Sequence, residues 1–177
     1  MPSVDDLLQG RVDRAGALAP DLDVVADHLD MEAGRLGFPI LDDAGIRRVL
    51  GGAKRIAIVG ASASPFRASN GVLVDLVRFG YEVVPVNPAE TTVNGLRCFP
   101  TLSDAVAETG PVDIVDVFRR REACPGHARE AVAVGAGCLW LQLGLVSREA
   151  GRIAHEGGLA IVMSRCTAIE YARLIGR

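Results

Sequence analysis

The alternation of short apolar runs with amphipathic stretches constrains the fold of this chain more than any other feature of its sequence. Residues 55–59 are mostly apolar and end at Gly60, as a parallel strand buried on both faces does. The next stretch has apolar residues at helical spacing and ends at Gly80. This strand-then-helix order recurs along the chain. It predicts an α/β fold whose parallel strands are joined by right-handed crossovers.

Five strands can be placed from this pattern. We expect them at residues 55–59, 81–86, 112–118, 138–143 and 159–163. Helices are expected between them, at residues 69–79, 102–108, 121–134 and 148–155. The sequence therefore predicts a doubly wound, mostly parallel five-stranded sheet with helices on both faces. A ligand of such a sheet lies beyond the carboxyl ends of its strands.

The charge of the chain is divided unevenly. Residues 1–44 carry ten acidic residues and three arginines, a net charge of −7, whereas residues 45–177 have a net charge of +4. Between Pro20 and Pro39 apolar residues recur at helical spacing, and capping acids begin a second helix at about residues 42–50. We therefore expect an acidic helical N-terminal extension over residues 1–44 and a folded domain over residues 45–177.

Composition excludes several classes of protein. No apolar run approaches the roughly 20 residues that span a bilayer, and the acidic N-terminus is unlike a signal peptide, so we expect a cytoplasmic protein with no membrane partner. A net charge of −3 gives no reason to expect nucleic-acid binding. The four cysteines are far apart and the three histidines lack metal-ligand spacing, which indicates reduced thiols and no metal site.

Small and hydroxyl-bearing residues follow the first strand, at residues 60–64. Such a loop lets backbone N–H groups approach a phosphate, and the start of the next helix favours an anion. Further donors stand near that helix start. The alternative is a strand-to-helix turn in which small residues have only a structural role. The candidate phosphate-binding residues here are Gly60, Ala61, Ser62, Arg67, Ser69 and Asn70.

The motifs of the common nucleotide-binding loops are incomplete. A dinucleotide fingerprint reads Gly-x-Gly-x-x-Gly, but Ser62 and Pro65 stand at the later glycine positions. Asn87 ends the second strand, where an acid would hold the ribose of NAD. The only lysine, Lys54, precedes a strand and cannot serve a Walker loop. These features argue against an NAD site and against nucleoside triphosphate hydrolysis.

Polar residues also end later strands. Arg119 begins an arginine run after the third strand and is the first choice for a phosphate contact, with a solvated helix start as the alternative for the rest of the run. Gln142 ends an apolar strand, with a structural amide as the alternative. Asp113 and Asp116 point to opposite faces of a strand, so they form no acid/base pair, although Asp116 is a candidate for burial beside the site. No catalytic constellation is present.

Taken together, the strand ends resemble those of the small stand-alone CoA-binding proteins, whose fold is that of the CoA-binding domain in the alpha subunit of succinyl-CoA synthetase. The resemblance covers about residues 54–174 and rests on five segments in order. They are Val59-Gly60-Ala61-Ser62 with Arg67 and Ser69, residues 80–88, residues 112–120, residues 139–144, and Met163-Ser164-Arg165-Cys166 with Glu170.

The resemblance implies a Rossmann-like domain that binds coenzyme A or an acyl-CoA. The first loop would hold phosphates, the ends of the second and third strands would line the nucleotide, and the last two strand ends would face the pantetheine arm. The thiol of Cys166 beside the CoA thiol suggests a mixed disulfide. The residues added to the candidate site are Asn87, Pro88, Phe118, Arg119, Gln142, Gly144, Arg165 and Cys166.

The chain departs from the family pattern at two positions. Ser164 stands where relatives often have Asp, and Ala168 where they often have Lys. The phosphohistidine of the synthetase is also not found, so the resemblance carries over binding and not ligase activity. An NAD(P)-dependent enzyme on the same fold and a regulatory or interaction protein without a ligand are the alternatives. A homo-oligomer is left open.

Overall fold

The chain divides into two units between residues 36 and 37. We describe residues 22–176 from a computed structural model. In the first unit, α2 (Leu22–Glu32) is the helix expected after Pro20, and Arg35 forms an ion pair of 2.9 Å with Asp30. Residues 1–21 of the predicted extension lie outside the described residues. The division at residues 44/45 stays a prediction.

The second unit is built on a parallel five-stranded sheet. Its strands are β1 (Arg55–Val59), β2 (Glu82–Val86), β5 (Ile114–Val117), β6 (Cys138–Leu141) and β7 (Ala160–Val162). Their order in the sheet is β2-β1-β5-β6-β7, and every neighbouring pair is parallel. This confirms the predicted Rossmann-like fold. The chain adds β2 on one side of β1 and β5 on the other, so the winding reverses between β1 and β5.

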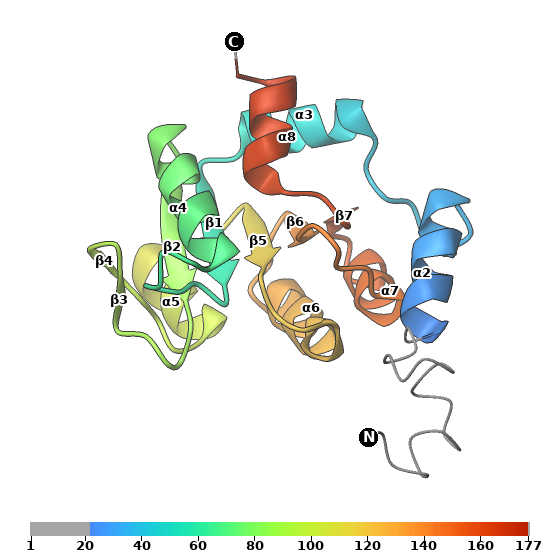
Figure 1. The fold of residues 1–177 in the computed structure, drawn as a ribbon. Helices are drawn as coiled ribbons and strands as arrows, with labels where there is room; N and C mark the ends of the chain where they lie inside the picture. The colour runs from blue at the N-terminus through green and yellow to red at the C-terminus, as the bar shows by residue number, and fades with distance from the viewer. Residues whose placement is uncertain (1–21, 177) are drawn as a thin grey trace, which may run out of the picture. The chain divides into compact units, whose positions relative to one another are not determined.

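Helices cover both faces of this sheet (Figure 1). On one face lie α3 (Asp43–Gly52), α4 (Ala68–Arg78) and α8 (Thr167–Leu174), and α8 packs against the other two. On the other face α6 (Cys124–Ala133) packs between α5 (Leu102–Thr109) and α7 (Arg148–Glu156). Apart from Arg55 and Asp116, the residues of β1, β5 and β6 are apolar on both sides, as burial of both faces of the sheet requires.

The core of the first face shows why these segments form. Leu73 and Leu76 of α4, three residues apart on one side of the helix, are buried against Ile56 and Ile58 of β1. Trp140 of β6 is fully buried in the same cluster, and its indole N–H donates a hydrogen bond of 2.7 Å to the carbonyl of Arg165. This contact ties the end of β7 to the sheet and so positions the chain that enters α8.

Three local elements differ from the expectation. The loop around Asn94-Gly95 is a hairpin of β3 (Thr92–Val93) and β4 (Leu96–Arg97), since both turn residues adopt positive φ, as a tight hairpin turn requires. The helix expected at residues 121–134 starts with a separate 3₁₀ turn, η1 (Arg121–Ala123). The helix α8 was not predicted, because its buried residues, Thr167, Ala168 and Glu170, do not form an apolar stripe.

None of the helices within residues 22–176 combines the length and the apolar character that crossing a membrane would require.

Candidate functional site

The reversal of winding brings the ends of β1 and β5 into close contact. Gly60 follows β1 with φ of +89°, and its N–H donates a hydrogen bond of 2.8 Å to Val86 at the end of β2. A Cβ atom on Gly60 would lie 2.5 Å from the carbonyl oxygen of Phe118, which follows β5. Only glycine fits this close approach. The sequence indicated the strand end at Gly60, and the structure adds the steric reason for a glycine there.

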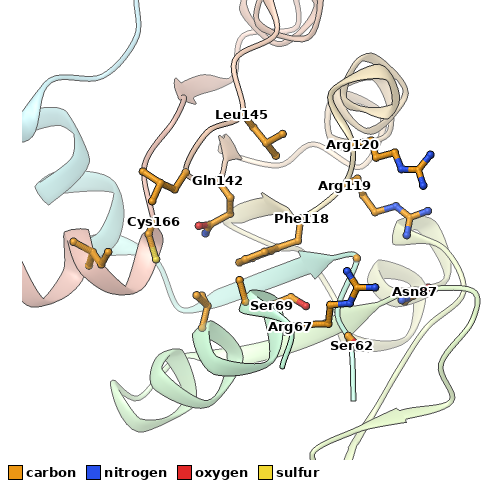
Figure 2. A pocket seen from close by; sticks show the side chains of 15 residues that line it. Ser62, Arg67, Ser69, Asn87, Phe118, Arg119, Arg120, Gln142, Leu145 and Cys166 are labelled. Carbon is orange, nitrogen blue, oxygen red and sulfur yellow. The ribbon is translucent and has the colours of Figure 1, made fainter. Parts of the chain in front are cut away.

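A cleft of about 620 Å³ opens at this point, beyond the carboxyl ends of β1, β5 and β6 (Figure 2). Its size lies within the range of small-molecule sites. Nine of the residues proposed from the sequence line it. They are Gly60, Ser62, Arg67, Ser69, Asn87, Phe118, Arg119, Gln142 and Cys166.

Three of the remaining proposed residues support the site from behind or beside it. Ala61 is fully buried, and its carbonyl accepts a hydrogen bond from Asn87. Asn70 is buried and donates from Nδ2 to the carbonyl of Ser62 at 2.8 Å. Pro88 lines an adjoining cleft of about 180 Å³ that also contains Arg119 and His127.

Two proposed residues lie outside both clefts. The N–H of Gly144 donates to Oγ of Ser164 at 3.2 Å. Arg165 forms ion pairs with Glu170 at 3.2 Å and with Asp43 at 3.6 Å. Asp43 lies in α3, far from Arg165 in the chain, and Glu170 lies in α8, which the sequence pattern did not predict, so this pairing was not expected. The structure does not bring Arg165 together with Arg67 and Arg119.

The loop after β1 is held in place from three sides. Asn70 holds the carbonyl of Ser62 from α4, and Asn87 holds that of Ala61 from the end of β2. The carboxylate of Glu90 accepts hydrogen bonds from the N–H of Ala63 at 3.0 Å and from Oγ of Ser62 at 3.4 Å. The sequence did not indicate Glu90, which lies in the irregular segment before β3.

One rim of the cleft is cationic. Arg67, Arg119 and Arg120 are exposed, and among residues 22–176 no group is hydrogen-bonded or ion-paired to their guanidinium groups. The first residues of α4, Ala68 and Ser69, line the cleft beside them, and the first turn of α4 contains no acid. A helix N-terminus and unpaired guanidinium groups both attract anions. The arrangement can bind phosphate.

The floor of the cleft contains a buried polar network. Gln142 donates from Nε2 to Oδ1 and Oδ2 of Asp116 at 2.8 and 3.0 Å and to Oγ1 of Thr167 at 2.9 Å. The hydroxyl of Thr167 donates to Oδ2 of Asp116 at 2.8 Å. Burial raises the pKa of Asp116 to about 7, and these hydrogen bonds oppose the rise. Asp116 is thus buried beside the site, as its sequence position suggested.

The other end of the cleft is less polar. Its lining there includes Val72, Leu143, Leu145 and Ile169 together with the half-buried thiol of Cys166. These apolar residues could not be recognised from the sequence, because apolar residues in helices and near strands normally belong to the core. Exposure separates two of them from the core, since Leu143 and Ile169 are 68% and 58% exposed.

The other three cysteines are buried. Burial raises the pKa of the Cys98 and Cys138 thiols and raises that of Cys124 to about 11. Cys166 is therefore the one cysteine of the cleft lining that a ligand could reach.

Among the described residues no group of three or more His, Cys, Asp or Glu side chains could hold a metal ion.

Comparison with known proteins agrees with this geometry. Residues 54–172 match the CoA binding domain family. The chain is 39% identical over 129 residues to YneT, an uncharacterised protein of Bacillus subtilis, covering 73% of this chain and 93% of that protein.

Solved structures are similar over the same part of the chain. A hypothetical protein from Pyrococcus horikoshii OT3 is 38% identical, with a TM-score of 0.72 over 77% of this chain and 94% of that one. A protein from Thermus thermophilus, cell-free ID.343, is 36% identical, with a TM-score of 0.71 over 76% of this chain and all of that one. On the match of its residues 54–172, the chain belongs to the CoA binding domain family, and this family supports a CoA-binding role.

Proposed function

We propose that the chain binds coenzyme A or an acyl-CoA in the cleft between β1 and β5, and that it does so without catalysis of its own. The observation that carries this proposal is the polarity of the cleft. Three guanidinium groups without a partner among residues 22–176 stand at one rim with the start of α4, and Cys166 with apolar side chains stands at the other end. Coenzyme A has the same order of groups, from phosphates to a neutral arm that ends in a thiol.

In this arrangement Arg67, Arg119 and the N–H groups that begin α4 bind phosphate oxygens. Asn87, Pro88 and Phe118 line the nucleotide, and the adjoining cleft beside Pro88 extends that part of the site. The pantetheine arm passes Gln142 toward Cys166. Of the proposed residues, Arg165 takes no direct part, because its guanidinium group is paired with Glu170 and Asp43.

The chemistry of the lining supports binding without catalysis. The described residues that line the main cleft include no histidine and no pair of carboxylates. The nearest carboxylate to its floor, Asp116, is fully buried and engaged by Gln142 and Thr167. The lining thus lacks the adjacent nucleophile and base from which an activated nucleophile is built.

Calorimetric titration of the full chain with CoA tests the proposal, with NADPH as the competing ligand. We expect CoA to bind and to raise the melting temperature, since a ligand of the native state stabilises it. Binding of NADPH but not CoA would favour the enzyme alternative, and no response to either would favour the ligand-free alternative.

Substitution of single arginines tests where the phosphates of CoA bind. Arg119→Ala should weaken CoA binding by about tenfold, the loss of one charge-assisted hydrogen bond. Arg78→Ala is the matched control, because Arg78 is 74% exposed at the far end of α4. If the two substitutions weakened CoA binding equally, Arg119 would not be a phosphate-binding residue.

A further inference from the structure

Gln142 is the polar side chain at the floor of the cleft, between Cys166 and Phe118 (Figure 2). It is 6% exposed at the end of β6. Its amide nitrogen is within 3.0 Å of both Asp116 and Thr167. An amide nitrogen has two hydrogens. Both hydrogens of Gln142 are therefore used inside the protein.

The chemistry of the partners fixes which way the amide points. Once Asp116 is ionised, above its pKa of about 7, its carboxylate can only accept a hydrogen bond, so only the nitrogen of Gln142 can face it. The hydroxyl of Thr167 uses its single hydrogen on Asp116 and can therefore only accept from Gln142. A reversed amide would place its carbonyl oxygen against three acceptor oxygens, a repulsive contact in a buried place.

The carbonyl oxygen of Gln142 is left over by this arrangement. Within residues 22–176 no protein donor is hydrogen-bonded to Oε1. The oxygen is nevertheless not a buried, unsatisfied atom, so it is exposed to solvent. Oε1 is thus reached from the cleft, where it offers an acceptor to whatever occupies the site. Among the described residues that line this part of the cleft there is no cationic side chain.

We infer that Asp116 and Thr167 are positioning residues, which hold the Gln142 amide so that its carbonyl oxygen accepts a hydrogen bond from a donor on the pantetheine arm of the ligand. The donor is an amide N–H or the terminal thiol. This inference rests on the proposed function and adds to it a selection for ligands with a hydrogen-bond donor at this depth. A ligand with only acceptor groups there would leave Oε1 unpaired.

Two ligands separate this role from general binding. Coenzyme A contains the arm, whereas adenosine 3′,5′-bisphosphate contains phosphates and base but no arm. Gln142→Leu should weaken CoA binding by about tenfold, the cost of one lost hydrogen bond, and leave the bisphosphate unchanged. Thr167→Val should act in the same direction, and Thr167→Ser, which keeps the hydroxyl, should restore the affinity for CoA.

A second readout does not depend on any ligand. In the NMR spectrum of the ligand-free wild-type protein at pH 8, the side-chain amide protons of Gln142 should exchange slowly and resonate downfield. They should shift in Asp116→Asn, whose amide can turn to donate to Gln142. Ser147→Ala is the control for a buried hydroxyl outside the cleft, because Ser147 caps α7 and should leave these signals in place.

Three results would overturn the inference. They are equal losses for both ligands in Gln142→Leu, unchanged CoA affinity in that variant, or fast exchange of the Gln142 amide protons in the wild type. Failure of the wild-type protein to bind CoA would instead overturn the proposed function itself. Binding by the wild type with no effect of Gln142→Leu would leave the proposed function in place.

Discussion

The side-chain amide of Asn87 donates a hydrogen bond of 2.7 Å to the backbone carbonyl of Ala61. This contact joins the end of β2 to the loop that follows β1. The oxygen of the same amide accepts from the N–H of Ala89 at 3.0 Å, so both ends of the side chain are engaged. In a dinucleotide-binding fold an acid at this strand end meets the ligand, whereas here an amide shapes the loop.

Asn87→Asp should therefore be more harmful than Asn87→Ala. Alanine removes the tie and should lower the free energy of unfolding by about 1 kcal/mol. Aspartate cannot donate to the carbonyl of Ala61 and adds negative charge beside the proposed phosphates, so its loss of CoA affinity should be the larger. Chemical unfolding and calorimetry measure the two effects. Tighter CoA binding by Asn87→Asp would show that the phosphates lie elsewhere.

The strand ends could be predicted because each depends on local pattern. The apolar run before Gly60 specifies a strand, and strands that are parallel must end at one edge of the sheet. The pairing of Arg165 could not be predicted in this way. Its partners, Asp43 and Glu170, come from α3 and α8, and the sequence pattern had not indicated α8.

The hydrogen-bonding partners of Gln142 could not be predicted from the sequence either. The position of Gln142 at a strand end could be predicted, but Thr167 approaches it from α8, and Asp116 approaches it through the pairing of β5 with β6. Residues that meet only through packing leave no periodic signal in the chain. The same reason explains why the apolar lining of Leu143 and Ile169 was not selected.

Gly60→Ala should destabilise the protein and abolish CoA binding. The positive φ disfavours any side chain, and the new methyl group would meet the carbonyl oxygen of Phe118 at 2.5 Å. We expect a loss of about 2 kcal/mol or more in the free energy of unfolding. Gly126→Ala is the control, since it lies in α6 with no atom within 4 Å of the added Cβ. That change should stabilise by up to about 1 kcal/mol, and equal destabilisation by the two would contradict this account.

Glu90→Gln should strengthen CoA binding. The carboxylate accepts a hydrogen bond of 3.0 Å from Ala63 in the proposed phosphate loop, and its negative charge opposes an incoming phosphate. Removing that charge should raise the affinity by about fivefold at low ionic strength, and salt should reduce the gain. Glu82→Gln is the matched control, because Glu82 pairs with Arg55 at the other end of β2. A weaker affinity in Glu90→Gln would assign Glu90 to ligand contact.

Asp116→Asn should change the dependence of stability on pH. Burial raises the pKa of Asp116 to about 7 from an ordinary 3.8, so between these values the native state binds a proton that the unfolded state has released. The free energy of unfolding of the wild type therefore falls as pH rises from 4 to 7, by up to about 4 kcal/mol from this group. The neighbouring thiol of Cys138 stays neutral in this range because burial raises its pKa.

In Asp116→Asn this contribution to the pH dependence of the free energy of unfolding is absent. The variant should gain stability relative to the wild type between pH 5 and pH 8, whatever its difference at either pH alone. Unfolding in urea at both values measures this double difference. A difference that is constant with pH would mean that Asp116 titrates near its ordinary pKa in the folded protein.

Cys166 should form a mixed disulfide when the protein meets the disulfide form of CoA. The Cys166 thiolate attacks one sulfur, a new S–S bond forms, and the second CoA leaves as its thiolate, so no further oxidant is needed. Mass spectrometry should show one added CoA, removed by dithiothreitol and absent from Cys166→Ser. The native chain contains its own control, because Cys98, Cys124 and Cys138 are buried and should stay unmodified until denaturant is added. Unchanged addition in Cys166→Ser would place the reactive thiol outside the cleft, whereas no addition in a wild-type protein that binds CoA would show that the arm does not bring its sulfur to Cys166.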